Sequence, residues 1–187
     1  MKRENFSAFV AANPISNHRV YYAPAASTSG NKVKIYRRAF ERMNHEYRVG
    51  MLSKINPIDR AIAKYEWGEF ILEQLPNYAD DRSELFNGAK ILIIRAYGMI
   101  SEERYNAKSA IKEATKALED FNKLIAENNL TAQAGRAISP KVIANRKAEL
   151  VNNITCRRKQ YADIVRRCPD HKFEHIRRRA EYCESMW

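Results

Sequence analysis

A run of apolar residues at helical spacing constrains this chain more than any other feature. Its members step by four and three residues in turn, which places them on one face of a helix. Ser101, Glu102 and Glu103 supply a cap and two acids for the first turn of that helix. A stripe of this spacing is typical of the seam between two packed helices, so we expect this helix to pair with a second one. The stripe consists of Ala107, Ile111, Ala114, Leu118, Phe121 and Ile125.

Helical signals also cover most of the remaining chain. Asn56 and Pro57 form one helix start, and Ser139 and Pro140 form another. We expect Gly98 to end a helix just before Ser101. Only six Gly and six Pro occur in 187 residues, which argues against a turn-rich β fold. The predicted fold class is therefore all-α, a bundle of five to six helices. Their expected ranges are 32–47, 57–75, 80–97, 101–125, 140–168 and 170–183.

The first 31 residues differ from the rest and predict an extended, mostly irregular N-terminal arm ahead of a helical bundle at 32–187. The arm's apolar residues follow no sustained period, so they cannot bury one another within the arm. The arm is either a loose tail or docked, and a docked arm, which we favour, lies in a groove on the chain's own helices or on a protein partner or second copy. The helical stripes suffice to close the bundle without the arm, which favours the partner. The arm residues expected at this contact are Phe6, Phe9, Ile15, Tyr21 and Tyr22.

Positive charge is concentrated at the two ends of the chain. The sequence has 33 Lys and Arg against 22 Asp and Glu, a net charge of +11. Residues 1–54 contribute +7, residues 55–138 contribute −2 and residues 139–187 contribute +6. This distribution predicts a basic first helix, neutral helices two to four, and basic C-terminal helices five and six. The candidate basic contact residues are Lys32, Lys34, Arg37, Arg38, Arg42, Arg157, Arg158, Lys159, Arg166, Arg167, Arg177, Arg178 and Arg179.

Two kinds of anionic partner fit such basic surfaces. The first hypothesis is a protein that binds nucleic acid or docks on a complex containing it, because Arg side chains suit bidentate contact with phosphate. The alternative is a protein-binding module, such as an assembly component or an inhibitor of a larger machine, which uses its basic surface on an acidic protein partner. No zinc-finger spacing, RNA-recognition signature or GXXG loop occurs in the sequence, so the chain offers no recognised nucleic-acid motif.

The sequence favours neither an enzyme nor a membrane protein. It lacks a phosphate-cradling glycine loop and a hydrolase elbow, so we expect no catalytic residue and no cofactor. Its longest apolar runs fall far short of the roughly 20 residues that cross a bilayer. Three cysteines without a clear export signal favour reduced thiols and a cytoplasmic, reducing environment.

The segment 168–175 contains residue types that can bind a metal ion. His171 and His175 are four residues apart, as helical zinc ligands often are, and Cys168 precedes them. Cys183 lies eight residues beyond His175, which is about 12 Å along a helix, so it cannot complete a four-ligand site. We therefore expect no bound metal.

Overall fold

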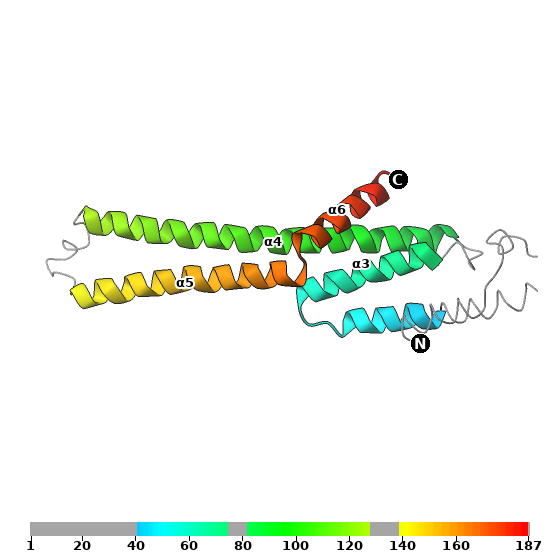
Figure 1. Cartoon of the computed structure of the whole chain (residues 1–187), viewed down its shortest axis with the longest axis horizontal. Helices are drawn as coiled ribbons and strands as arrows, with labels where there is room; N and C mark the ends of the chain where they lie inside the picture. The colour runs from blue at the N-terminus through cyan, green and yellow to red at the C-terminus, as the bar shows by residue number, and fades with distance from the viewer. Residues whose placement is uncertain (1–40, 75–81, 128–138, 187) are drawn as a thin grey trace, which may run out of the picture. The chain divides into compact units, whose positions relative to one another are not determined.

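The computed structural model describes residues 41–74, 82–127 and 139–186 (Figure 1). Of these described residues, 92% are helical, in five helical segments and with no strand. The prediction of an all-α fold is therefore confirmed. The predicted N-terminal arm at 1–31 lies outside the described residues, as does the first part of the predicted helix at 32–47.

Two helices, α3 and α5, begin where their capping residues predicted. A helical segment covers residues 41–52, and α3 then runs Pro57–Gln74. The Asn56 side chain accepts hydrogen bonds from the backbone N–H of Ile58 at 2.9 Å and of Asp59 at 3.4 Å. Ser139 caps α5, Pro140–Arg167, in the same way, with Pro140 in its first turn. The last helix is α6, Asp170–Glu184.

The predicted break near Gly98 is wrong. A single 45-residue helix, α4, runs Arg82–Ala126 and passes through Gly98 and Ser101. A glycine inside a helix costs only about 1 kcal/mol relative to alanine. Apolar residues at spacings of three and four precede the break as well as follow it, and they hold the helix on both sides. Ala89, Ile93 and Ala96 precede Gly98, Ile100 follows it, and all four have 0% exposure.

The chain packs as two compact units. Unit 1 contains the segment 41–52, α3, the first part of α4 up to Ile100, and α6; unit 2 contains Ser101–Pro169. The sequence predicted a division at residue 31 only, and the packing adds divisions after Ile100 and after Pro169.

Unit 1 has a core of fully buried apolar side chains. The helices α3 and α4 approach closely at Gly68, where a Cβ atom would lie 2.7 Å from Ile93 Cγ1 and 2.9 Å from the Ala89 carbonyl oxygen. Two ion pairs join α6 to α3: Arg179 Nε with Glu69 at 2.7 Å, and Lys172 with Glu66 at 3.7 Å. Burial raises the pKa of Tyr65 on α3 to about 12, with a contribution from Glu69. The α6 side chains buried in this unit are Ile176, Ala180 and Cys183.

Unit 2 is a helical hairpin. The second part of α4 and all of α5 lie side by side and antiparallel (Figure 1). The Arg104 guanidinium donates a hydrogen bond to the Cys168 carbonyl oxygen, and Lys108 Nζ lies 5.6 Å from the centre of the Tyr161 ring. The predicted pairing of the 101–125 stripe with a second helix is thus present. Of the described residues in this unit, the buried ones are Arg104, Ala114, Ile154 and Cys168.

Candidate nucleic-acid interface

The positive charge of the described residues is concentrated on α5. This helix carries eight basic residues and two acidic ones, a balance of +6. The part of α4 in the same hairpin, residues 101–126, carries five of each and has no net charge. The basic residues of α5 are Lys141, Arg146, Lys147, Arg157, Arg158, Lys159, Arg166 and Arg167.

Three consecutive basic residues of α5 form its densest charge. Arg157, Arg158 and Lys159 are all exposed, and consecutive residues on a helix point about 100° apart. Their side chains therefore fan around the helix instead of sharing one face. Arg157 hydrogen-bonds to the neutral Gln160 at 3.2 Å. Among the described residues, none of the three has an ion pair with a carboxylate.

The remaining predicted residues of α5 are partly neutralised. Arg166 and Arg167 both bind the carboxylate of Asp163, at 2.5 Å and 2.7 Å. The hydrogen bonds from Arg167 and then Arg166 lower the pKa of Asp163, which stays ionised beside them. The side chain of Arg167 is half-buried, whereas that of Arg166 is exposed. These two arginines therefore add less free positive charge than their number indicates.

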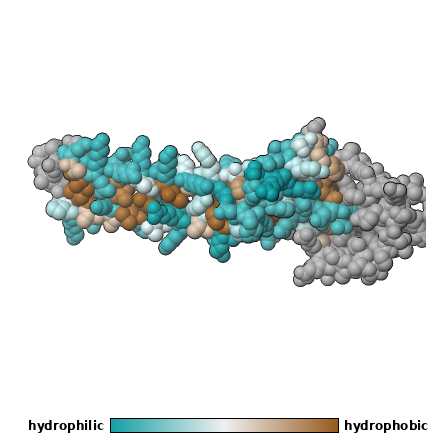
Figure 2. All heavy atoms as spheres, turned by 45° about the horizontal axis from the view of Figure 1, so that its top comes forward, coloured by the Kyte–Doolittle hydropathy of each residue, from teal (hydrophilic) through white to brown (hydrophobic). Residues whose placement is uncertain are grey.

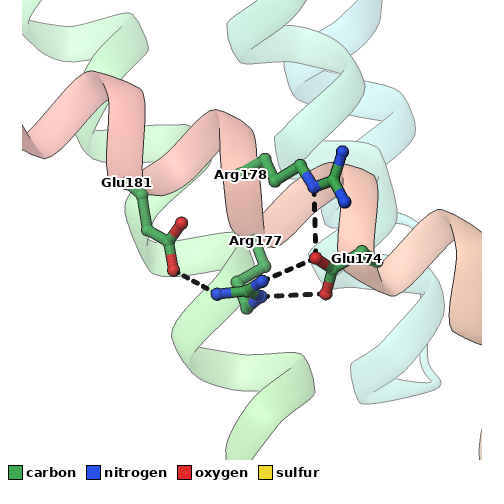
Figure 3. Close-up of polar contacts among 4 residues, drawn as sticks. All are labelled: Glu174, Arg177, Arg178 and Glu181. Carbon is green, nitrogen blue, oxygen red and sulfur yellow. Dashed lines mark hydrogen bonds and ion pairs between the residues drawn. The ribbon is translucent and has the colours of Figure 1, made fainter.

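The three predicted arginines of α6 all form ion pairs within unit 1. Arg177 bridges Glu174 and Glu181 at 2.5 Å and 2.6 Å, and Arg178 binds Glu174 at 3.1 Å (Figure 3). Arg179 binds Glu69 of α3. The helix has four basic and four acidic residues, so the C-terminal charge surplus belongs to α5 and not to α6.

Other predicted contact residues lie elsewhere or outside the described residues. Arg42 is exposed on the helical segment 41–52 in unit 1. Lys32, Lys34, Arg37 and Arg38 fall outside the described residues. So do the arm residues Phe6, Phe9, Ile15, Tyr21 and Tyr22.

Sequence reasoning missed three exposed basic residues of α5. Lys141, Arg146 and Lys147 lie in its first two turns, and Arg146 pairs with Glu149 at 2.9 Å. The signal was available, because the Ser139–Pro140 start assigns all three to the helix that also holds Arg157. Lys141 alone and the pair Arg146–Lys147 are shorter basic runs than Arg157–Lys159, so they stand out less in the sequence.

Known proteins give no assignment for this arrangement. No protein-family model matches the chain, and neither a curated protein nor a solved structure matches it.

The described part of the chain contains no group of three or more His, Cys, Asp or Glu side chains placed to hold a metal ion. His171 and His175 are exposed on α6, where the His175 ring meets the Tyr65 ring edge-on at 6.1 Å. Cys168 and Cys183 are buried and Cys156 is exposed, all as free thiols. Burial raises the pKa of the Cys183 thiol, so it stays protonated near neutral pH.

None of the described helices combines the length and the hydropathy that crossing a bilayer takes.

Proposed function

We propose that the protein is not an enzyme and that it binds nucleic acid, or docks on a complex containing it, through α5 of the hairpin. The observation that carries this proposal is the charge of α5, eight basic residues against two acidic ones. Arg157, Arg158 and Lys159 form its centre, since they are exposed and keep their charge free of carboxylates among the described residues. Guanidinium groups bind phosphate oxygens in pairs, which suits two of these three residues to a phosphate backbone.

The length of α5 also suits a polyanion. Lys141 and Arg166 are 25 residues apart, which is about 38 Å along a helix. Phosphates of one nucleic-acid strand repeat every 3.4 Å or so, so several could be contacted at once. Contacts of this kind depend on charge and not on base identity, and they release counterions on binding. We therefore expect affinity without strong sequence preference.

The test is the salt dependence of binding to a fluorescently labelled duplex and a labelled single strand. We expect the dissociation constant to rise by decades between about 50 and 200 mM salt. In the triple variant Arg157→Gln, Arg158→Gln, Lys159→Gln, the slope of log Kd against log salt should fall by about two to three, since each lost phosphate contact removes about 0.7–0.9.

A matched control removes the same charge from the other helix of the hairpin. Lys112, Lys116 and Lys123 are exposed on α4, and their replacement by Gln also lowers the net charge by three. We expect this variant to keep most of the wild-type slope. An equal decrease of the slope in both triple variants would show that nucleic acid is attracted to the net charge and not to α5. A wild-type Kd that does not change with salt would contradict the electrostatic proposal.

A second candidate function rests on a different observation. Among the described residues of the hairpin, three large aliphatic side chains are exposed: Leu124 by 42%, Val142 by 56% and Val151 by 46%. On the face shown in Figure 2, apolar side chains form an interrupted row among hydrophilic ones where α4 and α5 lie. Phosphate does not cover such side chains, whereas an acidic protein surface with apolar residues does. A protein-binding module in an assembly, or an inhibitor of a larger machine, is therefore the alternative.

Apolar variants separate the two candidates. Replacing Leu124 and Val151 by Ser should leave nucleic-acid affinity within about twofold, because neither residue contacts phosphate. The same variant should weaken a protein complex that survives nuclease treatment. With either partner we expect an intracellular, reducing environment, in which the exposed Cys156 stays a thiol.

A further inference from the structure

An apolar pocket in unit 1 has no part in the proposed function. Its volume is about 320 Å³, and it lies between the helical segment 41–52 and α3. Met43, Tyr47 and Met51 supply apolar walls, and the small residues Gly50 and Ala63 leave the space open. Methionine walls adapt to the shape of whatever they contact. The volume is at the small end of ligand pockets and suits one aromatic side chain.

The charged side chains at the pocket include both signs. Glu46 and Glu66 line it together with Lys54, and Glu66 also pairs with Lys172 of α6 at 3.7 Å. The fit of an occupant therefore depends on the apolar walls, which suit an aromatic side chain.

The helical segment that forms the pocket wall is also poorly covered elsewhere. Val49 is 51% exposed, Leu52 is 62% exposed, and Ile55 just beyond the helix is 92% exposed. Val49 and Leu52 fall on the face opposite Tyr47, because they lie about 200° and 140° from it on a helical wheel. A helix with apolar residues on both faces needs cover on both. The pocket and the exposed apolar residues on the opposite face therefore both involve the helical segment 41–52 and the residues just after it.

The chain itself supplies a segment of matching chemistry. Residues 1–40 carry seven basic residues and one acidic residue, and they contain Phe6, Phe9, Tyr21 and Tyr22. They join directly to the helix that lines the pocket. Eighteen residues lie between Tyr22 and Glu41, which allows a reach of up to about 60 Å. The pocket residues 43–54 extend over only about 17 Å of helix.

We propose that the segment 6–22 of the same chain docks here, with one of its aromatic side chains in the pocket. The sequence favours a partner's groove on the ground that the apolar stripes close the helical bundle without the arm. The pocket and the exposed residues 49–55 remove that reason, since unit 1 leaves apolar surface next to the point where the segment attaches. Attachment also raises the local concentration of the segment to the millimolar range, which favours the same chain over a second copy.

The test uses the full chain and a variant that fills the pocket without strain. A Cβ atom at Gly50 would have no atom within 4 Å, so Gly50→Leu can occupy the pocket. The measurement is the rate of trypsin cleavage after Arg19, between Ile15 and Tyr21, under limiting trypsin. We expect Gly50→Leu to be cleaved about tenfold faster or more, because cleavage follows the undocked population.

The control is Gly98→Leu in α4, a helical glycine that also has no atom within 4 Å of a Cβ atom. It should be cleaved at the wild-type rate. Both variants should melt no lower than wild type, because leucine favours helix over glycine. Equal cleavage of wild type and Gly50→Leu overturns the proposal. Protection that falls on dilution of the wild type also overturns it, because it assigns the docked segment to a second copy.

Discussion

At the scale of single residues, Gly68 sets how closely α3 and α4 approach. A Cβ atom there would lie 2.7 Å from Ile93 Cγ1 and 2.9 Å from the Ala89 carbonyl oxygen, and backbone cannot move aside cheaply. We expect Gly68→Ala to lower the free energy of unfolding by about 1–3 kcal/mol, as overpacking does. Gly98→Ala should raise it by about 0.5–1 kcal/mol, because its Cβ meets open space and alanine favours helix. Urea denaturation measures both, and two changes of the same sign would contradict this packing.

At the scale of an element, α6 carries a cluster of ion pairs formed by its own arginines and glutamates. Hydrogen bonds from Arg177 and then Arg178 lower the pKa of Glu174 to about 2. A carboxyl group with a lowered pKa stabilises the folded state above its unfolded pKa of about 4.5, and this contribution is lost as the pH falls from there toward 2. We expect NMR titration to show Glu174 ionised at pH 3.5. Arg177→Gln should move its midpoint toward 4.5, and Arg178→Gln should move it less. A wild-type midpoint near 4.5 would mean that the pairs do not persist in solution.

At the scale of the whole molecule, the two units differ in burial, and we expect them to differ in local stability. Unit 1 holds most of the described residues with 0% exposure, whereas the hairpin has only Cys168 among them. Amides in well-buried elements open more rarely than those in half-exposed ones. In hydrogen–deuterium exchange, residues 89–100 of α4 should therefore exchange about tenfold more slowly, or more, than residues 107–125. Both ranges lie on one helix, so helix propensity is largely matched. Equal exchange rates along α4 would show that residues 107–125 are protected by more than their packing against α5.

Helix existence and type followed from local patterns in the sequence. The caps at Asn56 and Ser139 act through neighbouring backbone N–H groups, so spacing alone locates those starts. The predicted helix end at Gly98 is wrong because it also depends on a local signal alone. A local signal worth about 1 kcal/mol was outweighed by apolar contacts on both sides of it, and those contacts are made with residues distant in the sequence.

The candidate site followed from the sequence in part. The sequence identified Arg157, Arg158 and Lys159, whose charge depends only on residue type. A count of charges does not separate them from Arg177, Arg178 and Arg179, because both groups are runs of three basic residues. Arg177 and Arg178 find their carboxylates one helical turn away, a pattern that spacing could have indicated. Arg179 pairs with Glu69, 110 positions away, and nothing local predicts that contact.

The sequence by itself determined the helical class of this protein, the residues that begin α3 and α5, and the total charge of each segment. These properties depend on residue type and on neighbours within a few positions, so they are present before the chain folds. The tertiary structure decided that α4 is continuous, that the chain packs as two units, and that the arginines of α6 are paired while the centre of α5 is not. The physical reason is that burial and ion pairing depend on which distant side chains come together, and the folded packing alone sets that.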